Sequence, residues 1–411
     1  MTNADAEGRC SARIATPAAG GPYEITFNDG DKVTLKNVLI GEVWICSGQS
    51  NMEMPMKGFH GQPTAGSADL IIGAKKSTLI RSCNVKRAAT LTEQETCEAT
   101  WYDHTPEGVA EASAAAYMFA KRLYETLEVP VGIINVSWGG STIHAWIKKD
   151  ILDKEFAGVF NMKFYETGEI PQHPNQASAL LYNAMLHPVA PYTAKGFIWH
   201  QGCSDIGRFD KYRSLQARFV KMLRDEWGNE DMPFYFTQIA PYSYGNPDAP
   251  GAGLMMWAQA QNVADIPHSG IAATHDSGEF ACIHPSNKKV VGDRLAYLAL
   301  TKDYGIKGID AETPIPHTFE FKDGKAYVTF NAGQIGLSPI EMDIEGFELA
   351  GEDKVFYPAT ARIQGNRQII AVSCPQVKEP VAVRYGIKNW SEATLFNCFG
   401  IPASPFRSDN W

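Results

Sequence analysis

A serine at the end of an apolar run is the first residue in this sequence whose surroundings suggest chemistry. Residues 43–48 read Val-Trp-Ile-Cys-Ser-Gly, and Gln49, Ser50 and Asn51 follow directly. A hydroxyl at the carboxyl end of a buried strand, held on a tight turn, is exposed to substrate while its backbone stays rigid. Gly48 lets the turn bend closely, and the N–H groups after it can point at an oxyanion. Ser50 is therefore a candidate nucleophile, although the pattern also fits a serine that only caps the next segment.

A histidine far downstream is the candidate base for this serine. Residues 282–288 read Cys-Ile-His-Pro-Ser-Asn-Lys, and a helical pattern runs from Lys288 to Leu300. An imidazole just before a helix can take a proton from a hydroxyl that is brought next to it. His284 is therefore expected to activate Ser50.

Two further glycine-containing turns follow strand-like runs. The run at residues 131–136 leads into Ser-Trp-Gly-Gly at residues 137–140, and the run at residues 196–199 leads into His-Gln-Gly-Cys-Ser-Asp at residues 200–205. In an open α/β sheet such strand ends converge on one crevice. We therefore expect the nucleophile, the base and at least two sources of N–H donors at the same edge of the sheet.

Together these blocks resemble the SGNH hydrolase superfamily and, within it, the sialate O-acetylesterase family. The similarity covers nearly the whole chain from about Gly20 onward and is carried by residues 41–53, 138–141, 181–185, 199–202, 283–285 with Lys288, and 401–407. The resemblance implies that Ser50 attacks an acetyl carbonyl, and that His284 takes the serine proton and returns it to the leaving sugar oxygen. Ser50 would stay acetylated until water releases acetate.

The resemblance also implies an oxyanion hole. Its donors would be the Ser50 N–H, a glycine of the second block and the side chain of Gln201. Of the two glycines we favour Gly139 over Gly140. For Gln201 the alternative is a buried amide whose hydrogen bonds are all internal.

The sequence departs from the family pattern at two positions that affect the mechanism. Cys203 stands where family members usually carry an acidic residue, and Cys282 stands where they often carry an aspartate, two residues before the histidine. The interpretation we favour is a disulfide between Cys203 and Cys282 that braces the loop of His284. The other interpretation is a pair of independent thiols that fill small apolar gaps.

With both acids replaced, another group must set the tautomer of His284. Asp205, Asp276 and Glu279 are within plausible reach, and a backbone carbonyl would also serve. For each carboxylate the alternative is a solvated position on a loop. A Ser50–His284 dyad without an acid is also open, because the other donors and the binding contacts still lower the barrier.

The elements that must position these residues form three segments. Residues 1–40 contain an alternating hairpin around Asn-Asp-Gly at residues 28–30, residues 41–305 alternate strands with helices, and residues 306–411 hold short strands and turns. The resemblance implies a three-layer α/β/α SGNH catalytic domain with a parallel sheet over the middle segment. The last segment is expected to be a β-sandwich that the N-terminal hairpin completes, since an isolated hairpin is marginal in water.

Composition and charge exclude several classes of protein. The 411 residues are 44% hydrophobic and 20% charged, which is typical of a globular protein, and a net charge of −9 argues against nucleic acid as a partner. No apolar run approaches the roughly 18 residues of a membrane helix, so we expect no membrane partner. The histidines and cysteines lack metal-ligand spacing, and nucleotide loops of the Gly-x-Gly-x-x-Gly or Walker type do not occur, so we expect neither metal nor cofactor.

Cysteine content bears on the compartment. Eight cysteines are more than a reduced cytosolic enzyme needs, which favours export to the periplasm or the extracellular space, with the cytoplasm as the alternative. Residues 1–8 have neither the basic start nor the apolar core of a signal peptide. Because the resemblance begins near Gly20, we expect the N-terminus to be trimmed or naturally short. The sequence does not indicate an oligomeric state.

The resemblance implies an acetylated carbohydrate as substrate. Four tryptophans that suit the faces of sugar rings, or that simply pack, lie in or near the active-site blocks: Trp44, Trp138, Trp199 and Trp257. The loops at residues 57–67, 156–176 and 242–254 hold no clear pair of arginines for a carboxylate, and their glycine and proline content favours acetylated xylan over sialic acid. The alternatives are a catalytically silent carbohydrate-binding relative and a broad short-chain ester hydrolase.

Overall fold

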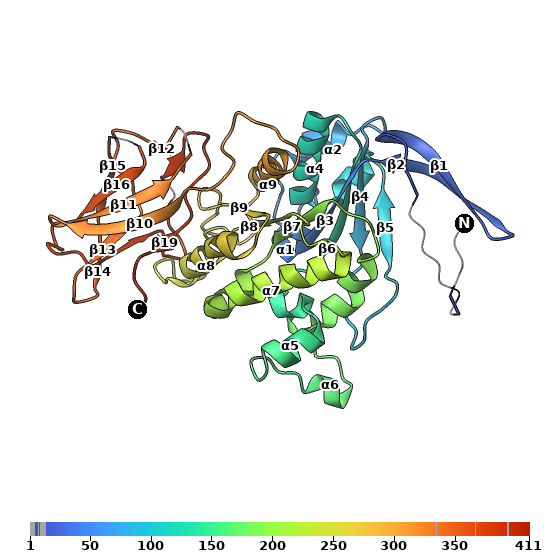
Figure 1. The fold of residues 1–411 in the computed structure, drawn as a ribbon, viewed down its shortest axis with the longest axis horizontal. Helices are drawn as coiled ribbons and strands as arrows, with labels where there is room; N and C mark the ends of the chain where they lie inside the picture. Colours follow the sequence, from blue (N-terminus) through green and yellow to red (C-terminus); the bar gives the residue numbers. More distant parts are fainter. Residues whose placement is uncertain (1–4, 7, 9–13, 334, 366, 393) are drawn as a thin grey trace.

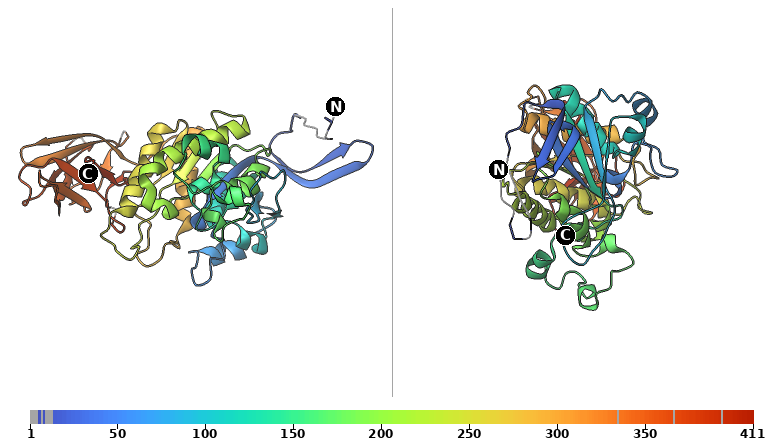
Figure 2. Two further views of the ribbon diagram at one scale, coloured as in Figure 1. Left: turned by 90° about the horizontal axis from the view of Figure 1, so that it is seen from below. Right: turned by 90° about the vertical axis from the view of Figure 1, so that its right-hand side faces the viewer.

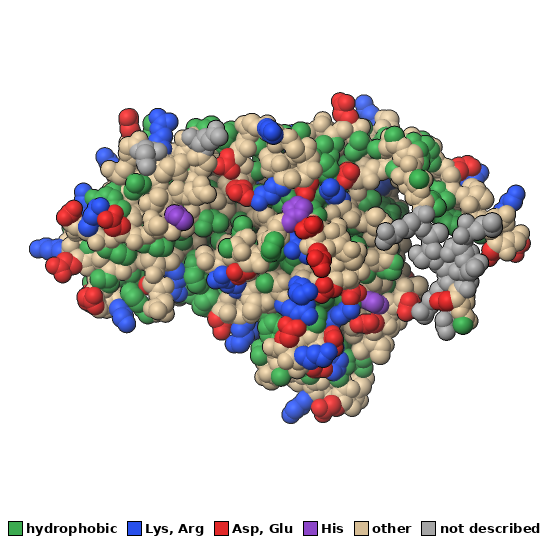
Figure 3. Space-filling model, viewed as in Figure 1, with side chains coloured by type: hydrophobic (Ala, Val, Ile, Leu, Met, Phe, Trp, Pro, Cys, Tyr) green, Lys and Arg blue, Asp and Glu red, His purple; other side chains and the backbone are tan. Residues whose placement is uncertain are grey.

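Three regions follow one another along the long axis of the molecule: an N-terminal hairpin, a central α/β domain and a C-terminal region of antiparallel sheets (Figure 1). The computed structural model describes residues 5–6, 8, 14–333, 335–365, 367–392 and 394–411. Within these residues no helix is long and apolar enough to cross a membrane. Basic and acidic side chains are interspersed over the described part of the face in Figure 3.

A seven-stranded sheet forms the centre of the α/β domain, in the order β5-β4-β6-β3-β7-β8-β9. Its strands are β3 (Glu42–Gly48), β4 (Ile80–Val85), β5 (Ala99–Tyr102), β6 (Val131–Ser137), β7 (Gly196–His200), β8 (Phe234–Thr237) and β9 (Ser269–Ala272). All neighbours are parallel except β4 and β5. In the register of the sheet Gly48 pairs with both Ser137 and His200. The turns that follow β3, β6 and β7 therefore start side by side.

Long helices cover both faces of this sheet (Figure 1). They are α4 (Ala114–Leu127), α7 (Phe209–Trp227), α8 (Gly251–Asp265) and α9 (Lys288–Lys302). Side chains of β3 alternate between the faces, so Ile45 packs in one core with α7 and α8, while Trp44 and Cys46 pack in a second core with α4 and α9. The domain is thus a mostly parallel sheet between helices, in agreement with the α/β prediction.

Helix α4 shows how the local sequence sets these elements. The Ser113 hydroxyl accepts a hydrogen bond from the Ala116 N–H and caps the helix, and Phe119 and Leu123 are fully buried on its inner face. The shorter helices are α1 (Ser50–Glu53), α2 (Ser67–Ile72), α3 (Pro106–Glu111), α5 (Lys149–Glu155) and α6 (Phe164–Thr167). Single turns of other helix types occur at Ile143–Trp146, Pro174–Gln176, Tyr182–Leu186, His187–Val189 and Cys203–Arg208.

Antiparallel sheets make up the C-terminal region, as expected for residues 306–411. One sheet contains β10 (Ile315–Lys322), β11 (Lys325–Asn331), β16 (Ile369–Ser373) and β15 (Thr360–Ile363), and another contains β14 (Phe356–Pro358), β13 (Phe347–Ala350), β17 (Ala382–Tyr385) and β19 (Phe406–Arg407). A third pairs β12 (Leu337–Ser338) with β18 (Phe396–Asn397). Val328 of β11 and Leu349 of β13 belong to one buried cluster, so the two larger sheets share a core.

The N-terminal hairpin does not complete this region, and that expectation for residues 1–40 is wrong. Strands β1 (Gly20–Asn28) and β2 (Lys32–Ile40) pair with each other in a separate two-stranded sheet. The hairpin projects from the end of the molecule opposite the C-terminal sheets (Figure 2). Since β3 begins at Glu42, the single intervening residue Gly41 ties the hairpin to the middle strand of the central sheet, whereas the C-terminal sheets follow α9 in the chain.

Candidate active site

The turn after β3 presents Ser50 at the start of α1. Gly48 has a φ of +139°, and a Cβ there would lie 2.2 Å from the carbonyl oxygen of His200, so this position requires glycine. The Gln49 N–H donates to the same carbonyl at 3.0 Å, and the Gln49 side-chain oxygen accepts from the Gly202 N–H at 3.0 Å. These bonds fix the turn to the end of β7. As the first residue of α1, Ser50 has an N–H without a partner inside the helix.

His284 lies beside this serine. The Ser50 Oγ is 2.8 Å from His284 Nε2, although 234 positions separate the two residues. Asn51 joins their segments, because its Nδ2 donates to the Ile283 carbonyl at 3.0 Å and its Oδ1 accepts from Lys288 Nζ at 2.5 Å. A hydroxyl and an imidazole at this distance can exchange a proton.

The other ring nitrogen of His284 faces a residue that the sequence did not single out. His284 Nδ1 is 2.7 Å from the Gln62 side-chain oxygen. This oxygen only accepts, so Nδ1 carries the hydrogen and Nε2 is free to accept from Ser50. Phe59 holds the Gln62 loop, since the two residues exchange backbone hydrogen bonds of 3.0 Å and the Phe59 ring packs edge-on against the imidazole with centroids 5.4 Å apart.

None of the three carboxylates expected from the sequence contacts His284. Asp276 forms two 2.6 Å hydrogen bonds with Arg294. Glu279 accepts from the Ser286 N–H at 2.6 Å and from the Ser286 hydroxyl at 2.7 Å, so it supports the histidine loop from a distance of two residues. The Asp205 carboxylate is buried and accepts from backbone and side-chain donors below the site.

The favoured disulfide between Cys203 and Cys282 is not formed, and the structure corrects that expectation. Both are free thiols, and the Cys282 sulfur lies 3.3 Å from the His284 carbonyl oxygen. Burial raises the pKa of Cys203, which keeps its thiol neutral. The other described cysteines are also free, and Cys10 lies outside the described residues.

Lys288 is a buried cation under the catalytic loop. Its side chain is nearly inaccessible, and burial lowers its pKa to about 8. Lys288 donates to the neutral amide oxygen of Asn51. The charge of the nearby Glu279 carboxylate opposes this shift in pKa, but burial outweighs it.

The glycine turn after β6 lies against the nucleophile. A Cβ on Gly139 would be 3.3 Å from the Ser50 Cβ, so a side chain there would press on the serine. The Gly139 N–H, expected to be an oxyanion donor, donates to Glu53 Oε2 at 2.8 Å. Glu53 in turn pairs with Arg87 at 2.5 Å. The sequence did not identify Glu53 or Arg87 as site residues, although Glu53 belongs to the block that resembles the family.

Gln201 lies fully buried between the turns after β6 and β7, and its side-chain oxygen has no hydrogen-bond partner among the described residues. Its fully buried amide nitrogen donates to the Ser141 carbonyl at 2.9 Å and to Asp205 Oδ2 at 2.6 Å. Both of its amide hydrogens are therefore engaged away from Ser50. In this arrangement Gln201 bridges the turns after β6 and β7, and its donation to an oxyanion stays a prediction.

These residues surround a pocket of about 410 Å³. Ser50, His284, Gly139, Glu53 and Arg87 line it, together with Gln49, Phe59, Gly140, Cys203, Ser204 and Ile283. Among the described residues no group of three or more His, Cys, Asp or Glu side chains is arranged to hold a metal ion.

The tryptophans differ in their relation to this pocket. Trp44 and Trp199 are fully buried and belong to the core, and Trp257 packs against the core of the C-terminal sheets. Trp138 is partly exposed beside the glycine turn, with the Arg87 guanidinium 5.8 Å from the centre of its ring. Trp138 adjoins Gly139 in the chain, but it is not among the residues that line the pocket of Ser50.

The electrostatics favour a neutral imidazole. Burial is the main cause that lowers the pKa of His284, and the nearby Lys288 ammonium lowers it further. The unprotonated ring is the form that can accept the Ser50 proton. The site thus combines a nucleophile, a base held in the correct tautomer and a helix N-terminus that can face an oxyanion.

Comparisons with known proteins place the chain among carbohydrate esterases. The family model described as carbohydrate esterase, sialic acid-specific acetylesterase matches residues 40–301. Sialate O-acetylesterase of Mus musculus is 25% identical, over 94% of this chain and 82% of the mouse protein. The enzyme of the same name from Homo sapiens is 29% identical, over 73% of this chain and 62% of the human protein, so the match spans less than two thirds of that relative.

A solved structure covers nearly the whole chain. The crystal structure of a novel carbohydrate acetylesterase from Xanthomonas citri superimposes with a TM-score of 0.89 at 33% identity, over 99% of this chain and 90% of that chain. A family match over more than half of the residues and a structural likeness of this extent lead to the same assignment. The protein belongs to the carbohydrate esterase family of sialic acid-specific acetylesterases and is a carboxylic ester hydrolase.

Proposed function

We propose that the protein releases acetate from O-acetylated sugars through a Ser50 acetyl-enzyme, with His284 as general base. The observation that carries the proposal is the 2.8 Å contact between Ser50 Oγ and His284 Nε2, with the opposite ring nitrogen held by Gln62. In this geometry His284 can activate the Ser50 hydroxyl although no carboxylate of the described residues is hydrogen-bonded to the imidazole.

The chemistry takes place in two halves. In the first, Ser50 Oγ bonds to the acetyl carbon as its proton moves to His284 Nε2, and the resulting oxyanion faces the Ser50 N–H. Collapse of this intermediate breaks the bond to the sugar oxygen, which leaves with the proton from His284. In the second, a water gives its proton to His284 and attacks the acetyl group, and acetate leaves as Ser50 takes the proton back.

The position of Glu53 controls whether the Gly139 N–H can donate a hydrogen bond to the oxyanion. Its carboxylate accepts from the Gly139 N–H, so that donor becomes available only when Glu53 turns away. The ion pair between Glu53 and Arg87 supplies a partner for the displaced carboxylate. The Ser50 N–H at the helix start and the turn at Gly139 and Gly140 are the donors that we assign to the oxyanion.

An uncharged sugar is the favoured carrier of the acetyl group, as in acetylated xylan. Arg87 lines the pocket, but it is already paired with Glu53 at 2.5 Å. A sialic acid carboxylate would have to compete with Glu53 for this guanidinium. A neutral sugar carries no carboxylate, so it can bind without breaking the pair between Arg87 and Glu53.

The test is acetate release from p-nitrophenyl acetate, acetylated xylan and an O-acetylated sialic acid by the wild type and by Ser50→Ala. We expect turnover by the wild type on the aryl ester and on xylan, and none by Ser50→Ala. Mass spectrometry of a rapidly quenched reaction is expected to find the acetyl group on the peptide that contains Ser50.

Two other results would point to the alternatives. If the wild type binds acetylated sugars but releases no acetate from any ester, it is a silent binding relative. If kcat/KM follows acyl chain length and ignores the sugar, it is a broad short-chain ester hydrolase. Activity that survives in Ser50→Ala would overturn the assignment of the nucleophile.

A further inference from the structure

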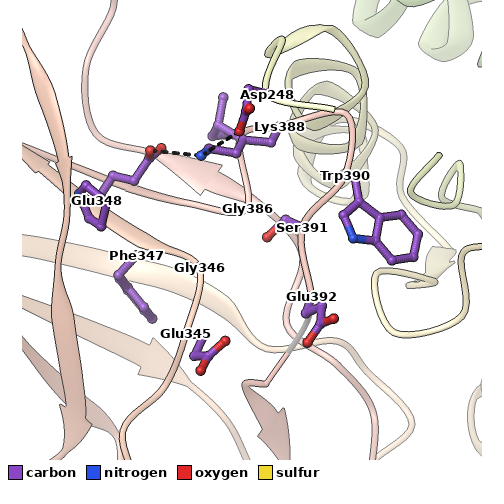
Figure 4. A pocket seen from close by; sticks show the side chains of 12 residues that line it. Asp248, Glu345, Gly346, Phe347, Glu348, Gly386, Lys388, Trp390, Ser391 and Glu392 are labelled. Atoms are coloured by element: carbon purple, nitrogen blue, oxygen red, sulfur yellow. Dashed lines mark hydrogen bonds and ion pairs between the residues drawn. The ribbon is translucent and has the colours of Figure 1, made fainter. Parts of the chain in front are cut away.

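A second pocket lies where the C-terminal sheets meet the α/β domain, with a volume of about 290 Å³. Segments on both sides of the boundary line it: Asp248 comes from the α/β domain, and residues 345–348 and 386–392 come from the C-terminal region. Figure 4 shows the side chains of these segments around the opening. The mechanism proposed above does not use this pocket.

The lining is acidic, and its single lysine is already occupied. Lys388 Nζ lies 3.2 Å from Asp248 and 3.6 Å from Glu348. The carboxylates of Glu345 and Glu392 lie across the opening from this group (Figure 4). An anionic ligand would be repelled here, whereas the hydroxyl groups of an uncharged sugar can donate to carboxylates.

An aromatic side chain joins the pocket to the loop that carries His284. Trp390 lines the pocket, and its ring packs edge-on against Phe280 with centroids 5.5 Å apart. Phe280 is 51% exposed and stands four residues before His284. An exposed phenylalanine next to a tryptophan gives an apolar surface of the kind that packs on sugar rings.

Backbone hydrogen bonds hold these aromatic residues in place. The Tyr242 N–H donates to the Asn389 carbonyl at 3.0 Å, and the Ser243 N–H donates to the Phe280 carbonyl at 3.2 Å. The Trp390 N–H donates to the Pro247 carbonyl at 3.0 Å. The loop at residues 242–247 therefore binds the Phe280 loop and the Trp390 segment together.

The same loop leads back to the catalytic pocket. The rings of Tyr242 and Tyr244 pack with centroids 4.8 Å apart, and Tyr244 lies beside Cys203. Cys203 lines the pocket of Ser50. The loop at residues 242–247 thus contacts the lining of the Ser50 pocket through Tyr244 and Cys203, and the segment of Trp390 through backbone hydrogen bonds.

We propose that Phe280, Trp390 and the adjoining pocket form a distal subsite for an uncharged oligosaccharide. The acetyl group at Ser50 would then be carried by a chain of sugars whose remote residues bind here. This inference rests on the proposed function and deepens it, because it assigns a binding site to the sugars that lie remote from the acetyl group.

Kinetics on substrates of different length test the subsite. Acetylated xylo-oligosaccharides of two and six sugars would be compared with p-nitrophenyl acetate, using the wild type, Phe280→Ala and Trp390→Ala. We expect the wild type to prefer the longer chain. In both variants kcat/KM for the six-sugar substrate should fall about tenfold relative to p-nitrophenyl acetate, mainly through KM.

Trp101→Ala is the matched control, since Trp101 is also exposed, at 46%, but lies on β5 at the far edge of the sheet. We expect this variant to keep the length preference. Because Phe280 is half exposed, its truncation should leave the fold intact, which a thermal melt checks. Binding of unacetylated xylohexaose to Ser50→Ala, measured by calorimetry, should weaken when Phe280→Ala is added.

The results separate the two proposals. If the wild type hydrolyses no ester, the proposed function fails, and calorimetry still reports on the subsite. If it hydrolyses p-nitrophenyl acetate with equal kcat/KM for two and six sugars, the subsite is overturned and the esterase stands. Preferential binding of a sialylated glycan over xylohexaose, lost in Phe280→Ala, would overturn the assignment of an uncharged ligand.

Discussion

The side-chain oxygen of Gln62 lies 2.7 Å from Nδ1 of His284, so a neutral amide takes the place that a carboxylate holds in a Ser-His-Asp triad. The amide oxygen fixes the tautomer of the ring, because it accepts the Nδ1 hydrogen. It carries no charge, however, and stabilises the imidazolium less than a carboxylate does. A triad aspartate both fixes the tautomer of the histidine and supplies a negative charge, whereas Gln62 fixes the tautomer only.

The wild type should keep its activity down to a low pH, so the acidic limb of its pH profile should have a low midpoint. Burial and the Lys288 ammonium lower the pKa of His284, and Gln62 adds no charge that would raise it. The neutral ring is the active form, so activity falls only as the pH drops through this lowered value. We expect the limb of kcat/KM for p-nitrophenyl acetate to have a midpoint below the ordinary histidine pKa of about 6.5. A midpoint above that value would contradict the electrostatic account.

Gln62→Glu should move this limb upward. A carboxylate at the same distance favours the imidazolium and raises the pKa of His284, by about one unit or more. Activity would then be lost at a higher pH than in the wild type, while the plateau above the limb stays level or rises, because the transition-state charge is better stabilised. Gln364→Glu, an exposed change in the C-terminal region, is the control and should leave the profile unchanged. Identical profiles for Gln62→Glu and the wild type would mean that residue 62 does not contact His284 in the active enzyme.

Gly139→Ala should impair the nucleophile. The added methyl would lie 3.3 Å from Ser50 Cβ and 3.0 Å from Glu53 Oε2, so the serine or the glycine turn must shift. Misplacement of a nucleophile by about 1 Å costs on the order of 10² in rate, and we expect kcat on p-nitrophenyl acetate to fall by that factor. Gly207→Ala is the matched control, because a Cβ there meets nothing within 4 Å. Equal activity in the two variants would show that the glycine turn accommodates the added methyl group without displacing Ser50.

Lys288→Met should reveal a pH-dependent cost of the buried ammonium. The folded-state pKa of Lys288 is about 8, below the ordinary value of 10.5, so the unfolded chain binds more protons between these values. The free energy of unfolding of the wild type should therefore rise relative to the variant as pH goes from 8 to 10.5. The full difference is on the order of 3 kcal/mol. Urea melts of both proteins across this range measure it, and a constant difference would refute the burial of a charged Lys288.

From the sequence alone we predicted the α/β alternation of the central domain, and the placement of Ser50 after a strand and of His284 before a helix. These predictions follow from local patterns, because an apolar strand, a glycine turn and a helix start can each be recognised from residues that are close together in the sequence. The parallel sheet then brings the ends of β3, β6 and β7 to one edge, as the register of Gly48 shows. The antiparallel sheets of the C-terminal region were likewise predicted from a local pattern, the short strands and turns of residues 306–411.

The surroundings of His284, in contrast, depend on packing between distant segments of the chain. Gln62 is 222 positions from His284 on a loop without periodicity, so nothing in its local sequence marked it. Asp276 and Glu279 were near enough along the chain, but the stronger partners Arg294 and Ser286 hold them. The direction of a side chain and the neighbour that satisfies it depend on packing between distant segments, which the spacing of residues does not encode.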